Sequence, residues 1–210
     1  MIYRHFFWDY DGTLYDTYPR ITRAIIKTMQ AYGVDADYDV LYPLLKKKFR
    51  CAWAAFLEPL GIPYEDFMDT YHRFSELETG DTMQLYPGAR EMLEAVVKNG
   101  GKNYLYTHRG QSAFGYLERD GLTELFTDCI TSQHNFHSKP APDALDYLAQ
   151  KHGLDKRECI MIGDRAIDLD AGKNAGMGCA LFDPEGYYPD YETPYRFSEI
   201  QAMQKVLIDG

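Results

Sequence analysis

The chain has 210 residues, a length that suits one medium domain or a core domain with a smaller insert. Its 45% hydrophobic and 26% charged residues are ordinary for a folded soluble protein. The formal net charge of -10 argues against a non-specific nucleic-acid binder, which usually carries a basic field. No apolar run reaches the length of a membrane span, and Arg4 and His5 interrupt the N-terminal one, so no signal peptide is expected.

The cysteines indicate a reducing compartment. None of Cys51, Cys129, Cys159 and Cys179 forms a C-x-x-C pair, and their spacing matches no zinc pattern. Buried free thiols are the expected state. We therefore expect a cytoplasmic protein with no nucleic-acid or membrane partner.

The first part of the chain changes from a strand to helices. Residues 3–8 are nearly all apolar or aromatic, which is typical of a buried central strand. Up to residue 83 the apolar residues then recur only at helical spacing. The expected helical segments run from Pro19 to the stop at Gly33, over 41–60 and over 64–78. The zone 41–60 is expected to be split into two helices.

From residue 84 helices and strands alternate. The expected helices start at Pro87 and cover 112–119, 142–151 and 166–174. The expected strands cover 103–107, 128–131, 159–162 and 178–182. The prolines of residues 186–197 predict a surface loop, and Ser198 with Gln201 predicts a capping box for a C-terminal helix.

This order predicts an α/β fold class. Strands that alternate with helices imply a doubly wound parallel sheet with helices on both faces. We expect residues 1–14 and 84–210 to form this core, and residues 15–83 to form an inserted all-helical domain.

Polar side chains gather where the expected strands end. They are Asp9 and Asp11 after 3–8, Thr107 at the end of 103–107, Asp164 and Asp168 after 159–162, and Lys139 before the helix 142–151. Ligands of open α/β sheets bind outside the carboxyl ends of the strands. Crowded carboxylates repel one another, and Mg²⁺, which prefers oxygen ligands, relieves that repulsion.

Four short motifs resemble those of a known family. They are Asp9-Tyr10-Asp11-Gly12-Thr13, Thr107, Lys139-Pro140-Ala141-Pro142 and Gly163-Asp164-x-x-x-Asp168. Their order and positions resemble the motifs of the haloacid dehalogenase-like hydrolases. The insert and the stretch Tyr86-Pro87-Gly88 are similar to the phosphoglycolate phosphatase and β-phosphoglucomutase group, which has a helical cap. The resemblance implies a Rossmann-like core with the insert as that cap.

The resemblance also implies catalytic and metal-binding roles. Asp9 is the implied nucleophile, and Asp11 the implied general acid and then base. The implied Mg²⁺ site comprises Asp9, the backbone carbonyl of Asp11, and Asp164. Asp168 supports this site by orienting Lys139 or metal-bound water, and a surface position for Asp168 stays open as an alternative. The second aspartate, Asp11, implies a phosphate-ester substrate, because dehalogenases and phosphonate hydrolases of this type lack it.

The same resemblance implies a substrate-binding set. Thr107 and Lys139 would bind the transferring phosphoryl oxygens. For His108, a hydrogen bond near the aspartyl-phosphate and simple packing against the loop both stay open. Arg109 and Arg165 flank the site, where they would add positive potential, but solvated loop arginines are the favoured interpretation.

The expected cap contains a basic cluster, formed by residues 46–48 and Arg50. A solvated helix face is the general interpretation of such a run. Arg50 is the candidate substrate ligand in it, because it lies four residues from Lys46 and would share its helix face.

We therefore expect a Mg²⁺-dependent phosphatase of a small phosphorylated metabolite, phosphoglycolate-like or a sugar phosphate, acting as a monomer or homodimer. A phosphomutase is the alternative enzyme, but residues 16–19 lack the histidine that the mutase subgroup places there. A non-catalytic protein that binds a phosphorylated ligand, or regulates through it, is the alternative of another class.

Overall fold

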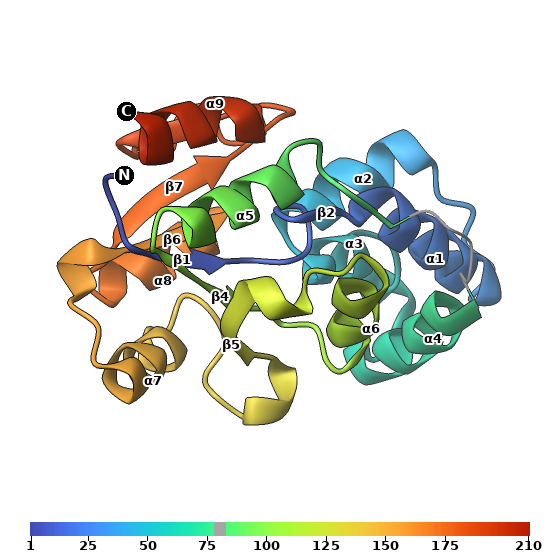
Figure 1. The fold of residues 1–210 in the computed structure, drawn as a ribbon. Coiled ribbons are helices and arrows are strands. Elements are labelled where there is room, and N and C mark those ends of the chain that lie inside the picture. Colours follow the sequence, from blue (N-terminus) through green and yellow to red (C-terminus); the bar gives the residue numbers. More distant parts are fainter. Residues whose placement is uncertain (78–82) are drawn as a thin grey trace. The chain divides into compact units, whose positions relative to one another are not determined.

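The computed structural model describes residues 1–77 and 83–210 (Figure 1). The chain divides into two compact units. Unit 1 comprises Met1–Tyr15 and Leu85–Gly210, and unit 2 comprises Asp16–Gln84. The short strands β2 (Tyr15–Asp16) and β3 (Gln84–Leu85), where the chain passes between the units, pair with each other. Residue 78, the last of the predicted helix 64–78, lies outside the described residues.

Unit 1 is built on a parallel sheet. Its strands are β1 (His5–Trp8), β4 (Lys102–Tyr106), β5 (Phe126–Ile130), β6 (Cys159–Gly163), β7 (Gly178–Phe182) and β8 (Tyr195–Phe197). They lie in the order β5-β4-β1-β6-β7-β8, and every pair is parallel. The central strand β1 is apolar because both of its faces are covered. The predicted α/β fold class is confirmed.

Helices cover both faces of this sheet (Figure 1). They are α5 (Ala89–Lys98), α6 (Ser112–Arg119), α7 (Asp143–His152), α8 (Ala166–Asn174) and α9 (Ile200–Gln204), followed by a π-helical turn over Lys205–Asp209. Phe7 and Met161 pack on one face in a cluster with buried residues of α7 and α8. Helices α5 and α9 contact each other on the other face. Single 3₁₀ turns occupy Thr123–Leu125, Ser132–His134 and Lys156–Glu158.

A buried polar pair connects the neighbouring strands β1 and β4 on the α5 face. The Trp8 indole N–H donates to the Asn103 side-chain oxygen at 2.9 Å. The Asn103 amide group in turn donates to the carbonyl oxygens of Leu93 and Leu125, at 3.0 and 3.1 Å. Asn103 is fully buried, so these bonds satisfy an amide that water cannot reach.

Unit 2 is helical. Its helices are α1 (Tyr18–Ala31), α2 (Tyr38–Lys47), α3 (Phe49–Phe56) and α4 (Tyr64–Leu77), with a 3₁₀ turn at Glu58–Leu60. Their apolar faces meet in one core that includes Ile25, Leu41, Trp53 and Phe67. This packing follows from the helical spacing of apolar residues in the sequence.

The basic cluster of unit 2 does not lie on one helix face. Lys48 is extended, with φ -169° and ψ 138°, and separates α2 from α3. Lys46 is consequently buried beside the Tyr18 ring, whereas Arg50 is exposed and lies over the rings of Trp53 and Tyr64. The prediction that Lys46 and Arg50 share a helix face is wrong, because the helix breaks between them.

The C-terminal part differs from the sequence prediction in two ways. Residues 195–197 of the predicted loop form β8, which pairs with β7 after the last proline, Pro194. This extended pairing carries the chain past Ser198, so Glu199 becomes the N-cap of α9, without a side-chain cap bond. The predicted capping box is therefore wrong.

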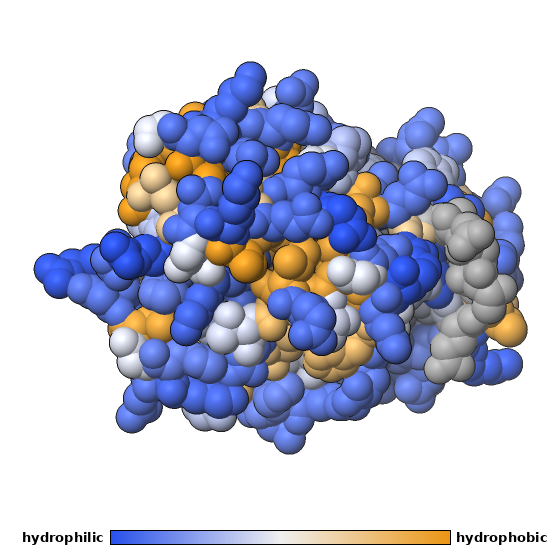
Figure 2. All heavy atoms as spheres, viewed as in Figure 1, coloured by the Kyte–Doolittle hydropathy of each residue, from blue (hydrophilic) through white to orange (hydrophobic). Residues whose placement is uncertain are grey.

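The surface is mainly polar in the view of Figure 2, where hydrophobic residues interrupt it in patches. None of the helices in residues 1–77 and 83–210 is long and apolar enough to cross a membrane. All four cysteines are free, with Cys159 and Cys179 buried and the other two partly buried. The cytoplasmic location stays a prediction.

Candidate active site

The register of the sheet aligns the functional strand ends. Trp8, the last residue of β1, pairs with Leu105 of β4 and Ile162 of β6. The Asp9 N–H continues this ladder by donating to the Ile162 carbonyl at 2.9 Å. Thr107 and Asp164 directly follow β4 and β6, so they emerge at the same edge of the sheet as Asp9.

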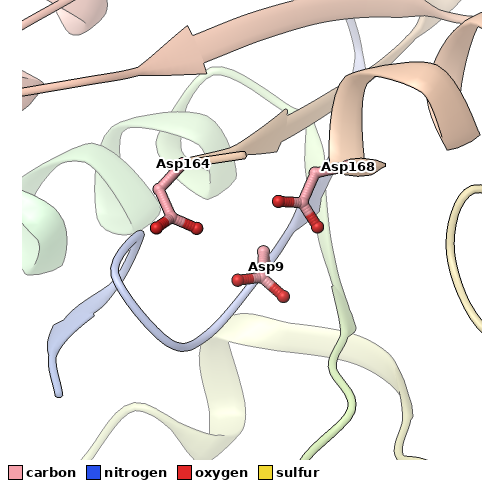
Figure 3. A group of neighbouring side chains, drawn as sticks. All are labelled: Asp9, Asp164 and Asp168. Carbon is pink, nitrogen blue, oxygen red and sulfur yellow. The ribbon is translucent and has the colours of Figure 1, made fainter. Parts of the chain in front are cut away.

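Three carboxylates meet at this edge (Figure 3). Asp9 follows β1, Asp164 follows β6, and Asp168 lies in the first turn of α8. One oxygen of each lies within 4.8 Å of those of the others, and all three residues are buried. This arrangement concentrates negative charge where little water can screen it.

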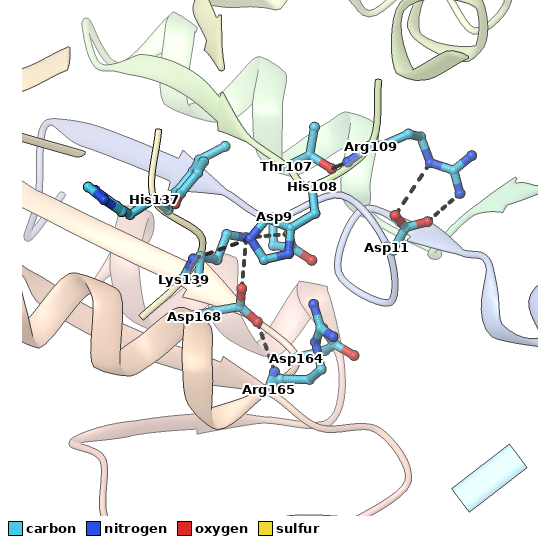
Figure 4. A network of polar contacts seen from close by, with 11 residues as sticks. Asp9, Asp11, Thr107, His108, Arg109, His137, Lys139, Asp164, Arg165 and Asp168 are labelled. Carbon is cyan, nitrogen blue, oxygen red and sulfur yellow. Dashed lines mark hydrogen bonds and ion pairs between the residues drawn. The ribbon is translucent and has the colours of Figure 1, made fainter. Parts of the chain in front are cut away.

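Lys139 supplies the positive charge inside this group. Its Nζ donates to Asp9 Oδ1 at 2.5 Å and to Asp168 Oδ1 at 2.8 Å, and its side chain is fully buried (Figure 4). Burial alone would lower the pKa of Lys139, but Asp168 and Asp9 together raise it. The lysine is therefore held in its charged form.

One lysine does not neutralise three carboxylates. Burial raises the pKa of Asp9 to about 7, although Lys139 opposes that shift. Asp9 Oδ2 is buried without a hydrogen-bond partner among the described residues. Buried carboxylate oxygens with surplus negative charge are the donor set that Mg²⁺ prefers. The residues present thus fit a divalent cation, with Asp9 and Asp164 as its carboxylate ligands.

Asp168 differs from the other two carboxylates. Its Oδ1 accepts from Lys139 and its Oδ2 accepts from the backbone N–H of Arg165 at 3.1 Å. Burial would raise the pKa of Asp168, but the charges of Lys139 and Arg165 lower it. Asp168 is fully buried, which excludes the surface position and favours a role in orienting Lys139.

Thr107 and His108 follow β4 and line a cavity of about 150 Å³, together with Ser132 and His137. Thr107 Oγ1 accepts the Arg109 backbone N–H at 3.0 Å, which leaves its own O–H available as a donor. His108 Nε2 accepts the Lys139 backbone N–H at 3.3 Å. Burial of the ring, and then the charge of Lys139, lower the pKa of His108 to about 4, so the imidazole is neutral near pH 7.

Asp11 lies outside the three-carboxylate group. Its carboxylate pairs with Arg109, whose NH2 nitrogen lies 2.5 Å from Asp11 Oδ1 (Figure 4). The predicted metal contact of Asp11 involves its backbone carbonyl and stays a prediction. Arg50 belongs to unit 2, and its substrate-binding role also stays a prediction.

The interpretation of Arg109 and Arg165 as solvated loop arginines is wrong. Each side chain is only 15% exposed, and Arg165 Nε lies 3.9 Å from Asp164 Oδ1. A lone arginine in a loop has no periodic pattern that marks its partner. The available signal was that each arginine follows, by two or three residues, the end of a strand at the acidic edge of the sheet.

Residues 3–176 match the model of the haloacid dehalogenase-like hydrolase family. The chain belongs to this family. The predicted family and enzyme class, a phosphatase of the haloacid dehalogenase-like type, are confirmed by this match and by the relatives below.

This hydrolase is 30% identical over 188 residues to a phosphoglycolate phosphatase of Vibrio parahaemolyticus. The matched region covers 83% of this chain and 80% of the relative. It is 27% identical over 180 residues to pyrophosphatase PpaX of Halalkalibacterium halodurans, with the same two coverages of 83% and 80%. Among solved structures, a hydrolase of Streptococcus pneumoniae TIGR4 is 30% identical, covers 99% of each chain and has a TM-score of 0.68.

Gly163 is the last residue of β6 and directly precedes Asp164. A Cβ on Gly163 would lie 2.2 Å from Asp168 Cβ, a distance that real structures do not tolerate. Gly163→Ala is therefore expected to displace Asp168 and Lys139, and to lower kcat about 100-fold. Steady-state kinetics and thermal unfolding check this. Gly121→Ala is the control, because it meets nothing within 4 Å, although its positive φ costs some stability. Equal kcat values for both variants would contradict the prediction.

Proposed function

We propose that this hydrolase is a Mg²⁺-dependent phosphatase that cleaves a small phosphorylated metabolite through a phospho-Asp9 intermediate. The observation that carries the proposal is the buried group of Asp9, Asp164, Asp168 and Lys139 at one edge of the sheet. In this group Asp9 is the proposed nucleophile, Lys139 is the charged hydrogen-bond donor, and the carboxylate oxygens of Asp9 and Asp164 are the proposed metal ligands.

In the first half-reaction, an Asp9 oxygen attacks phosphorus and the bond from phosphorus to the ester oxygen breaks. Asp11 gives its proton to that leaving oxygen, so the alcohol departs neutral. In the second half-reaction, water attacks the phosphorus of phospho-Asp9. Asp11 takes a proton from this water, and inorganic phosphate and the free Asp9 carboxylate result.

Two side chains are suited to the phosphoryl oxygens. Lys139 uses two of its three N–H donors on Asp9 and Asp168, which leaves one for the substrate. Thr107 has its O–H available because it accepts from Arg109. Mg²⁺ bound by Asp9 and Asp164 would reduce the repulsion between carboxylate and phosphoryl group and stabilise transition-state charge.

We further propose that unit 2 is the cap that selects the substrate. The chain enters it after Asp11 and returns before α5, so it interrupts the core between its first two sheet strands. Arg50 is the proposed ligand for the remainder of an anionic substrate. 2-Phosphoglycolate and pyrophosphate are the first substrates to test, because relatives carry those names.

The proposed function is tested by measuring the release of inorganic phosphate from a panel of phosphorylated compounds in the presence of Mg²⁺. The panel comprises 2-phosphoglycolate, pyrophosphate, several sugar monophosphates and p-nitrophenyl phosphate. Free phosphate from at least one member is expected. An isomeric sugar phosphate as product would instead support the phosphomutase alternative, and no turnover with any divalent metal would support a non-catalytic protein.

Asp164→Asn is expected to weaken Mg²⁺ binding by at least about 100-fold, because one charged ligand is lost. Activity titrated with Mg²⁺ and the rise in melting temperature on adding Mg²⁺ both report this. Asp170→Asn is the control, since Asp170 lies on α8 and accepts from the Tyr191 hydroxyl instead. Unchanged Mg²⁺ dependence in Asp164→Asn would refute the proposed metal site.

A further inference from the structure

Arg109 binds Asp11 at two points. Its NH2 nitrogen donates to Asp11 Oδ1 at 2.5 Å and its Nε donates to Oδ2 at 3.4 Å. The side chains are 15% and 25% exposed, so water only partly screens the pair. A planar guanidinium that contacts both carboxylate oxygens restricts the rotation of that carboxyl group.

The backbone of Arg109 is itself fixed. Its N–H donates to Thr107 Oγ1 at 3.0 Å, and its carbonyl accepts from the Ser132 N–H at 3.1 Å. Both bonds connect Arg109 to strand ends, because Thr107 follows β4 and Ser132 follows β5 by two residues. The side chain therefore starts from a defined position.

The Tyr10 ring packs against the Arg109 guanidinium. The Arg109 Cζ atom lies 5.2 Å from the centre of the Tyr10 ring, a cation–π distance. Tyr10 is fully buried and stacks on Tyr15 with ring centres 4.5 Å apart. The Tyr15 hydroxyl donates to Asp120 Oδ2 at 2.9 Å, which fixes this second ring.

We propose that Arg109 is a positioning residue that sets the orientation of the Asp11 carboxyl group for proton transfer. The inference rests on the proposed role of Asp11. It assigns no contact between Arg109 and the reacting atoms. In Figure 4, Lys139 binds the Asp9 carboxylate, while Arg109 binds the carboxylate of Asp11. The nucleophile and the proton-transfer group are thus each oriented by a cation of their own.

The test uses two esters that differ in their need for an acid. An alkyl phosphate accepted by the enzyme needs protonation of its leaving oxygen, whereas the nitrophenolate of p-nitrophenyl phosphate departs without it. The value of kcat/KM reports only steps up to departure of this group, so hydrolysis of phospho-Asp9 does not enter. The test compares kcat/KM for both esters in four variants, which are Asp11→Asn, Arg109→Gln, Arg109→Lys and the Asp11→Asn/Arg109→Gln double variant.

Arg109→Gln is expected to lower kcat/KM for the alkyl phosphate about 10- to 100-fold more than for p-nitrophenyl phosphate. Arg109→Lys keeps the charge but not the two-point contact. Its extra loss of kcat/KM for the alkyl phosphate is therefore expected to be smaller than that of Arg109→Gln, but not zero. In the Asp11→Asn background, Arg109→Gln has no further selective effect, because the group that it positions is already disabled.

Other outcomes overturn the inference. An equal loss for both esters means that Arg109 binds substrate or supports the loop. The inference is also rejected if the ratio of the two kcat/KM values in Arg109→Gln and in Arg109→Lys equals that of the unsubstituted enzyme. If Asp11→Asn shows a selective loss in that case, the proposed function still stands. If Asp11→Asn shows no selective loss, the acid role of Asp11 fails, and the inference fails with it.

Arg157→Gln is the matched control. Arg157 contacts both carboxylate oxygens of Asp155, with its NH2 nitrogen 2.6 Å from Oδ2, and its side chain is 88% exposed. Its loss removes a surface Arg–Asp pair of the same kind without touching Asp11. The ratio of the two kcat/KM values is expected to equal that of the unsubstituted enzyme.

Discussion

Asp9→Asn is expected to lower phosphatase activity by at least about 10³-fold for every ester. The amide is a poor nucleophile, so phospho-Asp9 does not form. Activity on p-nitrophenyl phosphate falls as much as on natural esters, since the loss is independent of the leaving group. Residual activity near that of the unsubstituted enzyme would refute the covalent mechanism.

The same substitution is expected to raise the melting temperature of the metal-free protein. The pKa of Asp9 lies near 7 in the folded state, above the ordinary value of 3.8. The folded state therefore binds this proton more tightly than the unfolded state, and stability falls as pH rises from about 4 to about 7. Asparagine carries no such charge and avoids this loss.

Thermal unfolding with EDTA at pH 4.5 and pH 8 measures this effect. The melting temperature of Asp9→Asn should exceed that of the unsubstituted protein at pH 8, and the difference should shrink at pH 4.5. Added Mg²⁺ should stabilise the unsubstituted protein more than the variant. A lower melting temperature for Asp9→Asn at pH 8 would contradict this account of the buried charge.

Lys139→Met is expected to have the largest effect on stability. It leaves Asp9 and Asp168 buried without their shared cation. Breaking a buried ion pair in this way costs about 3–5 kcal/mol of unfolding free energy. Activity is also lost, because the donor for the phosphoryl oxygens is gone.

Urea unfolding with EDTA at pH 8 measures this cost. The double variant Lys139→Met/Asp168→Asn should recover part of the stability, since it also removes a buried negative charge, but none of the activity. Lys156→Met is the control, because Lys156 pairs with Asp146 where both side chains are more than 40% exposed, and such pairs contribute less than about 1 kcal/mol. An equal loss in both lysine variants would reject the prediction.

The sheet and its functional edge were predictable because their signals are local. An apolar run that ends in Asp9, and a second that ends in Gly163-Asp164, identify strands and their carboxyl ends directly. The rule that parallel strands present their ends at one edge then brings distant residues together. Lys139 was placed near this edge by its position before the helix 142–151, but its role followed only from the family resemblance, because a loop lysine before a proline has no local signal.

Features that depend on tertiary partners were not predictable. The partner of Arg109, Asp11, lies 98 positions away in sequence, so the loop sequence does not reveal their ion pair. The sequence predicts that the helical zone 41–60 splits into two, which α2 and α3 confirm, but apolar spacing does not place the break at Lys48. Likewise β8 is three residues long, and only pairing with β7 makes it a strand.

The Trp8–Asn103 bond has a consequence for how the chain selects its alignment during folding. Apolar strands slide past one another with little penalty, and a slip of one residue turns every side chain to the opposite face. Such a slip of β1 would leave the Asn103 amide buried without its indole donor and would direct Asp9 toward α5, away from Lys139. The Asn103 amide, at the opposite end of β4 from Thr107, thus destabilises misaligned sheets. In such sheets the proposed catalytic groups would not come together.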